Sequence, residues 1–199
     1  MCHTLVVFVT ERGRERLNTT NGKIAAQSKQ KIADALLFVM ERYSFKEITV
    51  TQLAQEAGLS RKTFYRLFDD KEAVLSYWFE KLYIECIQRI RTLGIYHYWE
   101  VMECYFDFWE ERKQMLLLFK RHGLLAALFD GAYKYSFDIF LEIRSREILS
   151  EYAVPLPYLL AYSIGGIHSM LIKWAENDME IPSRELIGKL RSAFASSEV

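Results

Sequence analysis

Cysteine is scarce in this chain of 199 residues, which holds only Cys2, Cys86 and Cys104. Three scattered cysteines provide neither a disulfide framework nor a paired metal site, and they fit a reducing compartment best. Long apolar runs are also missing, because the longest one near the start, Leu5–Val9, is too short for a signal peptide or a membrane span. We therefore expect a soluble, cytoplasmic protein with no membrane partner.

A net charge of one sign is absent, because 26 Lys and Arg residues balance 26 Asp and Glu residues. The balance hides an asymmetry: eleven basic residues stand against six acidic ones up to Phe68, and fifteen against twenty from Asp69 onward. The basic front third predicts a part that faces nucleic acid. Hydrophobic residues make up 51% of the chain and aromatic residues 15%, which is enough for a sizeable core and excludes a disordered chain.

Proline is absent before Pro155, and strand-like alternation is nearly absent throughout, so the pattern predicts an all-α fold. Residues 1–23 lack a clear helical period up to Gly22 and predict a flexible tail. An apolar stripe that ends at Met40 and Tyr43 predicts the first helix at 25–43. Further long helices are predicted at 71–92, 96–112, 114–122, 124–148, 157–177 and 183–195.

The segment Thr49–Phe68, TVTQLAQEAGLSRKTFYRLF, has the pattern of a helix-turn-helix. Thr49 and Gln52 predict a capping box before the first short helix, and Ser60 is a typical N-cap for the second. Gly58 permits the turn between them. The second helix keeps on its outer face the residue types that reach phosphates and base edges in a major groove: Arg61, Lys62, Thr63, Tyr65 and Arg66.

The stretch Ile48–Leu75, ITVTQLAQEAGLSRKTFYRLFDDKEAVL, resembles the DNA-binding domain of the TetR (tetracycline-repressor-like) family of bacterial transcriptional regulators. The resemblance rests on three spaced motifs that follow one another along the chain: TV-x-x-LA-x-x-AGLS, TFY-x-x-F and DKE-x-L. It implies an N-terminal three-helix, helix-turn-helix DNA-binding head at residues 24–70 and a helical C-terminal ligand-binding and dimerisation domain at 71–199. The family often has His where this chain has Leu67, so a DNA contact by that His is not expected here.

Nine residues are expected at the DNA on the strength of their types and of this resemblance: Thr49, Thr51, Ser60, Arg61, Lys62, Thr63, Tyr65, Arg66 and Lys71. Thr49 and Thr51 are expected beside phosphates, and Arg61 and Arg66 at the bases. A lysine in the first turn of a helix opposes the helix dipole, whereas a phosphate held there would favour it, so Lys71 is expected to hold the DNA backbone. Capping alone also accounts for Thr49 and Ser60, and packing on its own helix accounts for Tyr65.

Aromatic residues crowd the region after residue 96. Together with a few polar groups they suit an apolar pocket, the usual form of a small-molecule site. The expected effector pocket comprises Tyr105, Trp109, Phe119, His122, Phe129, Tyr133 and Tyr162. Ordinary core packing is the alternative, and no feature indicates which effector binds.

Small residues interrupt the apolar helix predicted at 157–177. Gly165 and Gly166 each lower helix stability by roughly 1 kcal/mol against alanine, which is tolerated where another backbone comes close. The resemblance implies that the last two helices pair with those of a second copy. The expected dimer interface is Leu159, Ser163, Gly166, Ile167, Met170, Trp174, Leu186 and Leu190. Close packing within one subunit is the alternative.

The sequence thus predicts a homodimeric transcriptional regulator, a repressor rather than an activator, that binds a palindromic double-stranded DNA operator and responds to an unknown small-molecule effector. Such a protein would work in the bacterial cytoplasm at the nucleoid. Cofactors and metals are not expected, because the four histidines lack ligand spacing, and catalysis is not expected, because carboxylates such as Glu110 and Glu111 fit solvated helix faces. The alternatives are a helical protein-interaction module without DNA readout and, less favoured, a helical enzyme.

Overall fold

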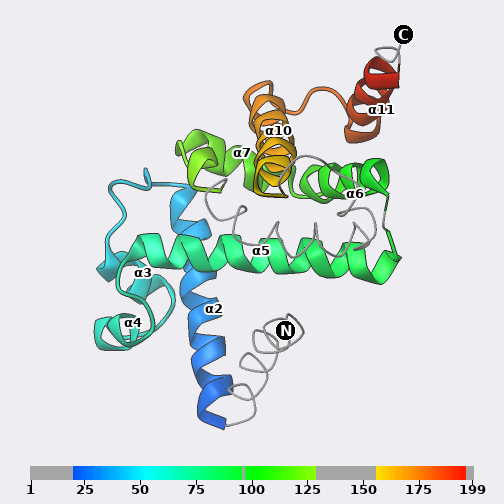
Figure 1. Cartoon of the computed structure of the whole chain (residues 1–199). Helices are drawn as coiled ribbons and strands as arrows, with labels where there is room; N and C mark the ends of the chain where they lie inside the picture. The colour runs from blue at the N-terminus through cyan, green and yellow to red at the C-terminus, as the bar shows by residue number, and fades with distance from the viewer. Residues whose placement is uncertain (1–19, 96, 129–155, 196–199) are drawn as a thin grey trace. The chain divides into compact units, whose positions relative to one another are not determined.

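The computed structural model describes residues 20–95, 97–128 and 156–195, and these residues form helices joined by short connections (Figure 1). The all-α prediction is confirmed for this part of the chain. Most of the expected tail and most of the helix expected at 124–148 lie outside the described residues. The labelled helices are α2 (Thr20–Met40), α3 (Val50–Glu56), α4 (Arg61–Leu67), α5 (Lys71–Leu93), α6 (Tyr98–Glu110), α7 (Lys113–Arg121), α10 (Leu156–Glu176) and α11 (Ser183–Ala195).

The described helices fall into two compact units, one up to Trp78 and the other from Phe79 onward. The boundary lies within α5, whereas the expected domain boundary precedes that helix. The first turns of α5 belong with α2, because the Trp78 Nε1 donates a hydrogen bond of 2.6 Å to the Ala33 carbonyl. None of the described helices is long and apolar enough to cross a membrane.

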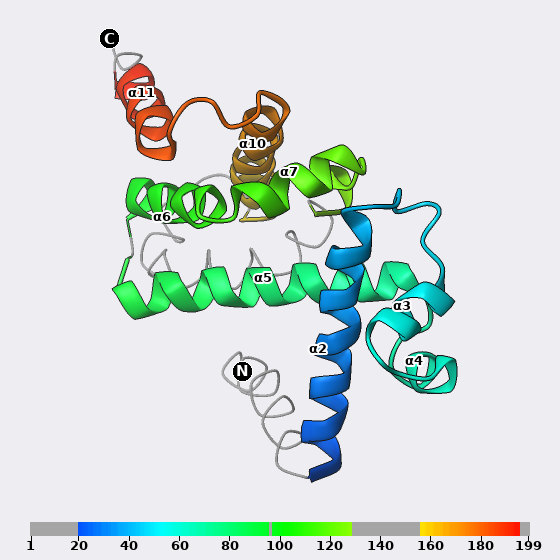
Figure 2. The same cartoon turned by 180° about the vertical axis from the view of Figure 1, so that it is seen from behind.

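The first unit is built on α2, which packs against both α3 and α4, as the view from behind also shows (Figure 2). The predicted stripe on α2 is buried from Ile32 to Met40. Tyr43, which was expected on that stripe, is instead about half exposed, because α2 ends at Met40. Phe45 and Ile48 in the following connection are buried, so they add to this small core.

The second unit has an aromatic core on α6. Phe106, Phe108 and Trp109 are almost completely buried, and Phe106 lies against the Trp174 ring of α10 at a centroid distance of 5.5 Å. The helix α11 packs on α6. Its predicted bounds, 183–195, agree with the structure.

Candidate nucleic-acid interface

The first helix of the predicted helix-turn-helix begins with the expected capping box. The Thr49 backbone N–H donates to Gln52 Oε1 at 2.8 Å, and the Gln52 backbone N–H donates to Thr49 Oγ1 at 3.2 Å. The helix α3 ends before Gly58, whose φ of +65° lies in the left-handed region that glycine adopts without strain. These local contacts set the position at which the next helix begins.

The second helix of the motif, α4, is anchored from its inner side. Ser60 caps it by accepting a hydrogen bond of 3.0 Å from the Thr63 backbone N–H. Phe64 is fully buried, and Phe68, which follows the helix, is nearly so. Because the helix is only two turns long, this burial fixes which of its side chains face the solvent.

The outer face of α4 carries three cationic side chains, Arg61, Lys62 and Arg66, and all three are exposed. No described carboxylate forms an ion pair with any of them, whereas Arg89 and Arg112 in the second unit are both paired with glutamates. Tyr65 lies on the same face, about half exposed, with its ring edge-on to Phe64. The cationic side chains of this face can therefore bind an anionic partner without breaking an ion pair within the described part of the protein.

The expected threonine and serine contacts have structural roles as well. Thr49 and Ser60 are the two N-caps, and the hydroxyls of Ser60 and Thr63 lie 3.0 Å apart. Thr51 is exposed in the first turn of α3. Their contacts with DNA remain predictions.

The Lys71 side chain has a different environment from the one that the sequence indicated. Its Nζ donates to the backbone carbonyls of Phe45, Lys46 and Ile48 at 2.7, 2.9 and 3.0 Å. Rather than pointing away from the protein, the ammonium group is held by the connection between α2 and α3. The expected phosphate contact at Lys71 is therefore reconsidered below.

Part of the expected effector pocket comes together in the second unit around residues that the sequence did not single out. The Tyr105 hydroxyl and the His168 Nδ1 lie 3.1 Å apart, and the Tyr83 hydroxyl donates to the Leu128 carbonyl at 2.7 Å. Trp109 is buried beside Tyr105, with ring centroids 6.5 Å apart. Next to His168 lies a cavity of about 10 Å³, which is room for about one water molecule.

Burial keeps this polar cluster uncharged. It lowers the pKa of His168 to about 4 and raises the pKa of Tyr105 and of Tyr83 well above the usual value for tyrosine. Burial likewise raises the pKa of the nearby Cys86 thiol to about 12. All four groups are therefore neutral at physiological pH, and the Cys86 thiol is not a reactive thiolate.

The other expected pocket residues lie elsewhere. Phe119 is buried against Phe79, with ring centroids 5.2 Å apart, and His122 lies at the C-terminal cap of α7. Tyr162 is 76% exposed, so it does not line a closed pocket among the described residues. Phe129 and Tyr133 lie outside the described residues. The signal for His168 was available in the sequence, because it continues the buried i, i+4 spacing from Ile164.

The predicted dimer face of α10 is rotated from the face that is most exposed. Tyr158, Tyr162 and Gly166 are exposed at i, i+4 and i+8. Trp174, by contrast, is only 4% exposed and donates from Nε1 to the Ile181 carbonyl at 2.7 Å, so it belongs to the subunit's own core. Five residues of the expected dimer interface are partly buried: Ser163, Ile167, Met170, Leu186 and Leu190. The side chain of Leu159 is not among those that the structure describes.

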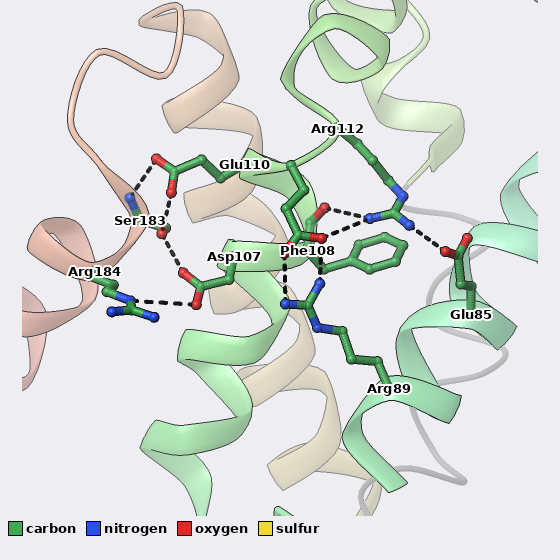
Figure 3. Close-up of polar contacts among 9 residues, drawn as sticks. Glu85, Arg89, Asp107, Phe108, Glu110, Arg112, Ser183 and Arg184 are labelled. Atoms are coloured by element: carbon green, nitrogen blue, oxygen red, sulfur yellow. Dashed lines mark hydrogen bonds and ion pairs between the residues drawn. The ribbon is translucent and has the colours of Figure 1, made fainter. Parts of the chain in front are cut away.

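The carboxylates of α6 are not merely solvated. Glu110 accepts hydrogen bonds from the backbone N–H and the hydroxyl of Ser183 at 3.0 and 2.7 Å, and Asp107 lies 2.5 Å from the same hydroxyl (Figure 3). Glu111 forms a two-pronged pair with Arg89 at 2.5 and 2.8 Å. These contacts correct the prediction for Glu110, which is partly buried, whereas Glu111 is 53% exposed and lies on a solvated face as predicted. They fasten α11 to α6 and α5 to the end of α6.

Comparison with known proteins identifies the N-terminal part of the chain. Residues 32–77 match the family model for "Bacterial regulatory proteins, tetR family". This range contains α3, α4 and the start of α5. No curated protein matches the chain in sequence.

Solved structures resemble most of the chain. A tetR-family transcriptional regulator from Streptomyces coelicolor is 21% identical with a TM-score of 0.56, covering 86% of this chain and 80% of its own. The dihydroxyacetone kinase operon activator DhaS is 17% identical with a TM-score of 0.53, covering 85% and 95%. The fatty acid degradation regulator FadR from Bacillus halodurans is 15% identical with a TM-score of 0.52, covering 83% and 93%. At these identities the similarity shows a common fold.

Proposed function

We propose that the chain is a DNA-binding transcriptional regulator of the TetR family, because residues 32–77 match the family model and a tetR-family regulator shares the fold. It binds a palindromic operator as a homodimer, represses the genes beside the operator, and leaves the DNA when a small-molecule effector binds in the second unit. Effector binding would favour a conformation in which the two DNA-binding heads no longer fit successive major grooves.

The observation that carries this proposal is the unpaired cationic face of α4. Arg61, Lys62 and Arg66 are exposed on one short helix whose opposite side is anchored by Phe64. Arginine and lysine on a recognition helix bind phosphates and the acceptor atoms of guanine in the major groove. The sequence-based prediction that these side chains read DNA is thus supported by their exposure and by the absence of described ion pairs.

A second copy of the chain is the proposed partner of α10. Tyr158 and Tyr162 expose large rings on one face of this helix, and a Cβ added at Gly165 or Gly166 would meet no described atom within 4 Å. Close packing against described parts of the same subunit therefore does not explain the two glycines. Pairing across a two-fold axis would use them and would set two recognition helices roughly 34–36 Å apart, one turn of DNA.

The proposed effector is an uncharged, largely apolar molecule that can form a hydrogen bond. Tyr105, His168 and Tyr83 are neutral polar groups in an apolar and aromatic surrounding. Because the cavity beside His168 has room for about one water molecule, the effector would enter only as the surrounding side chains move apart. An ionised ligand would lose its hydration there without a described opposite charge to replace it. A panel of uncharged aromatic esters and alcohols should raise the melting temperature more than benzoate and benzylammonium, and stronger stabilisation by the charged compounds would contradict the proposal.

The DNA proposal is tested with the full chain and fragments of its own genome, in excess non-specific DNA and at more than one salt concentration. Enrichment of a short palindrome is expected. The double variant Lys62→Ala/Arg66→Ala should then bind that palindrome at least about 100-fold more weakly, because each lost contact costs about 1–3 kcal/mol. The control Lys31→Ala/Arg191→Ala removes exposed charges from α2 and α11 and should bind nearly as the wild type does.

Two outcomes would contradict the proposal. Equal losses in both double variants would mean that binding reflects general charge rather than the α4 face. Retention of no sequence above the salt-sensitive background, with or without candidate effectors, would favour the interaction-module alternative.

The dimer is tested separately by sedimentation. Tyr162→Glu should yield monomers, whereas Tyr43→Glu, which changes an exposed tyrosine of the first unit, should sediment as the wild type does. A dimer that persists in Tyr162→Glu would place the interface elsewhere.

A further inference from the structure

The ammonium group of Lys71 lies in a ring of backbone carbonyls within the first unit. It donates to Phe45, Lys46 and Ile48 at 2.7 to 3.0 Å, and it lies 5.0 Å from the centre of the Phe45 ring. These partners are 23 to 26 residues earlier in the chain. A side chain at the start of α5 thus holds the connection that leads into α3.

The three hydrogen bonds use every donor that the lysine has. A lysine ammonium has three N–H groups and no acceptor, and each of the three finds a carbonyl here. A phosphate contact would require the ammonium to leave at least one of these carbonyls. The same arrangement explains why a cation is tolerated in the first turn of α5. The positive end of the helix dipole disfavours a cation there, and the partial negative charges of the three carbonyl oxygens offset this effect.

The position of the held segment connects Lys71 to DNA binding. The carbonyl of Ile48 directly precedes Thr49, the N-cap of α3, and Thr51 lies in the first turn of the same helix. Phe45 and Ile48, which supply two of the three carbonyls, also have buried side chains, so this segment has little freedom once the lysine is in place. A change in its path would move the first turn of α3 and the expected phosphate contacts with it.

We propose that Lys71 is a positioning residue for DNA binding, which fixes the start of α3 through three carbonyls and does not neutralise a phosphate. The inference rests on the proposed DNA-binding function and replaces the phosphate contact expected at this lysine. It attributes the loss of operator affinity on mutation of Lys71 to a displaced α3 rather than to a missing positive charge. The two causes predict different dependences of operator binding on salt concentration.

The test compares Lys71→Met with wild type in the full-length protein, at a temperature at which circular dichroism shows both to be fully folded. The variant should bind the operator at least about tenfold more weakly, while the slope of log K against log[salt] stays at the wild-type value. Each lost phosphate contact would lower the steepness of that slope by about 0.9, or about 1.8 for two copies in a dimer. Lys62→Met, which removes an exposed cation of α4, is the reference for a lost phosphate contact and should lower the steepness.

Lys71→Arg supplies a second and opposite comparison. Arginine binds phosphate well, so a phosphate contact would be preserved in this variant. The planar guanidinium cannot direct three donors at three converging carbonyls, so the positioning role predicts weakened binding with an unchanged slope. This variant keeps the charge and serves also if Lys71→Met does not fold.

Hydrogen exchange without DNA separates this inference from the proposed function. The backbone N–H groups of α3 should exchange faster in Lys71→Met than in wild type, while those of α11 should not change. If wild type binds no operator, the proposed function fails, and the exchange result still shows whether the hydrogen bonds of Lys71 hold the start of α3. If wild type binds and Lys71→Met lowers the slope by about 1.8, or if Lys71→Arg binds as wild type does, the positioning role is wrong and the DNA-binding function stands.

Discussion

Acid should destabilise the second unit through His168. This imidazole is 5% exposed, and burial lowers its pKa to about 4, against about 6.5 in an unfolded chain. The unfolded chain therefore takes up the proton first, so stability is complete above pH 6.5 and falls as the pH decreases from 6.5 towards 4. Because one pKa unit corresponds to 1.36 kcal/mol, the loss from His168 between pH 7 and pH 5 is about 2 kcal/mol.

The groups that face the imidazole do not offset this loss. Tyr105 on α6 and Tyr83 on α5 lie against it, and burial raises the pKa of both, so neither changes charge between pH 7 and pH 5. The Tyr105 hydroxyl lies 3.1 Å from the His168 Nδ1 and can donate to it or accept from it, so this contact does not supply a negative charge to a protonated imidazole.

The assay is urea unfolding, followed by tryptophan fluorescence at pH 7 and at pH 5. Between the two values the free energy of unfolding of wild type should fall by about 2 kcal/mol more than that of His168→Gln, because other titrating groups contribute equally to both. His97→Gln, which changes a histidine exposed before α6, should follow wild type. The same pH dependence in wild type and His168→Gln would refute the reasoning.

Two further substitutions probe the polar contacts of the second unit. Ser183→Ala should lower the free energy of unfolding by about 2–3 kcal/mol, because its buried hydroxyl serves two carboxylates, whereas Ser192→Ala on the exposed side of α11 should cost under about 0.5 kcal/mol. Equal losses in thermal unfolding would contradict this role of Ser183. Glu111→Gln should cost about 0.5–1 kcal/mol, since Glu111 is 53% exposed. The hydrogen bonds from Arg89 lower the pKa of Glu111, so its contribution is present above pH 4.3 and is lost as the pH falls further; an undiminished cost in 1 M NaCl would contradict the ion pair.

Much of the DNA-binding motif could be predicted because its determinants are local. The capping box of Thr49 and Gln52, the N-cap at Ser60 and the left-handed Gly58 each act within three or four residues, and the structure confirms all three. The apolar spacing of α2 likewise predicted which of its residues are buried, up to the helix end that leaves Tyr43 exposed. For the body, spacing predicted the helices but not which aromatic residues share a cluster.

The sequence by itself thus determined the helices, the turn and the outward face of α4, because helical periodicity and caps depend on near neighbours. Only the tertiary structure decided the partners of Lys71, Glu110 and His168, which lie 26, 73 and 63 residues away along the chain. A lysine in a first turn or a glutamate on a helix face is compatible with several partners until the elements pack. Packing brings Lys71 to the carbonyls that follow α2, and it brings Glu110 to the start of α11. These contacts, which the sequence pattern does not specify, determine the role of each side chain.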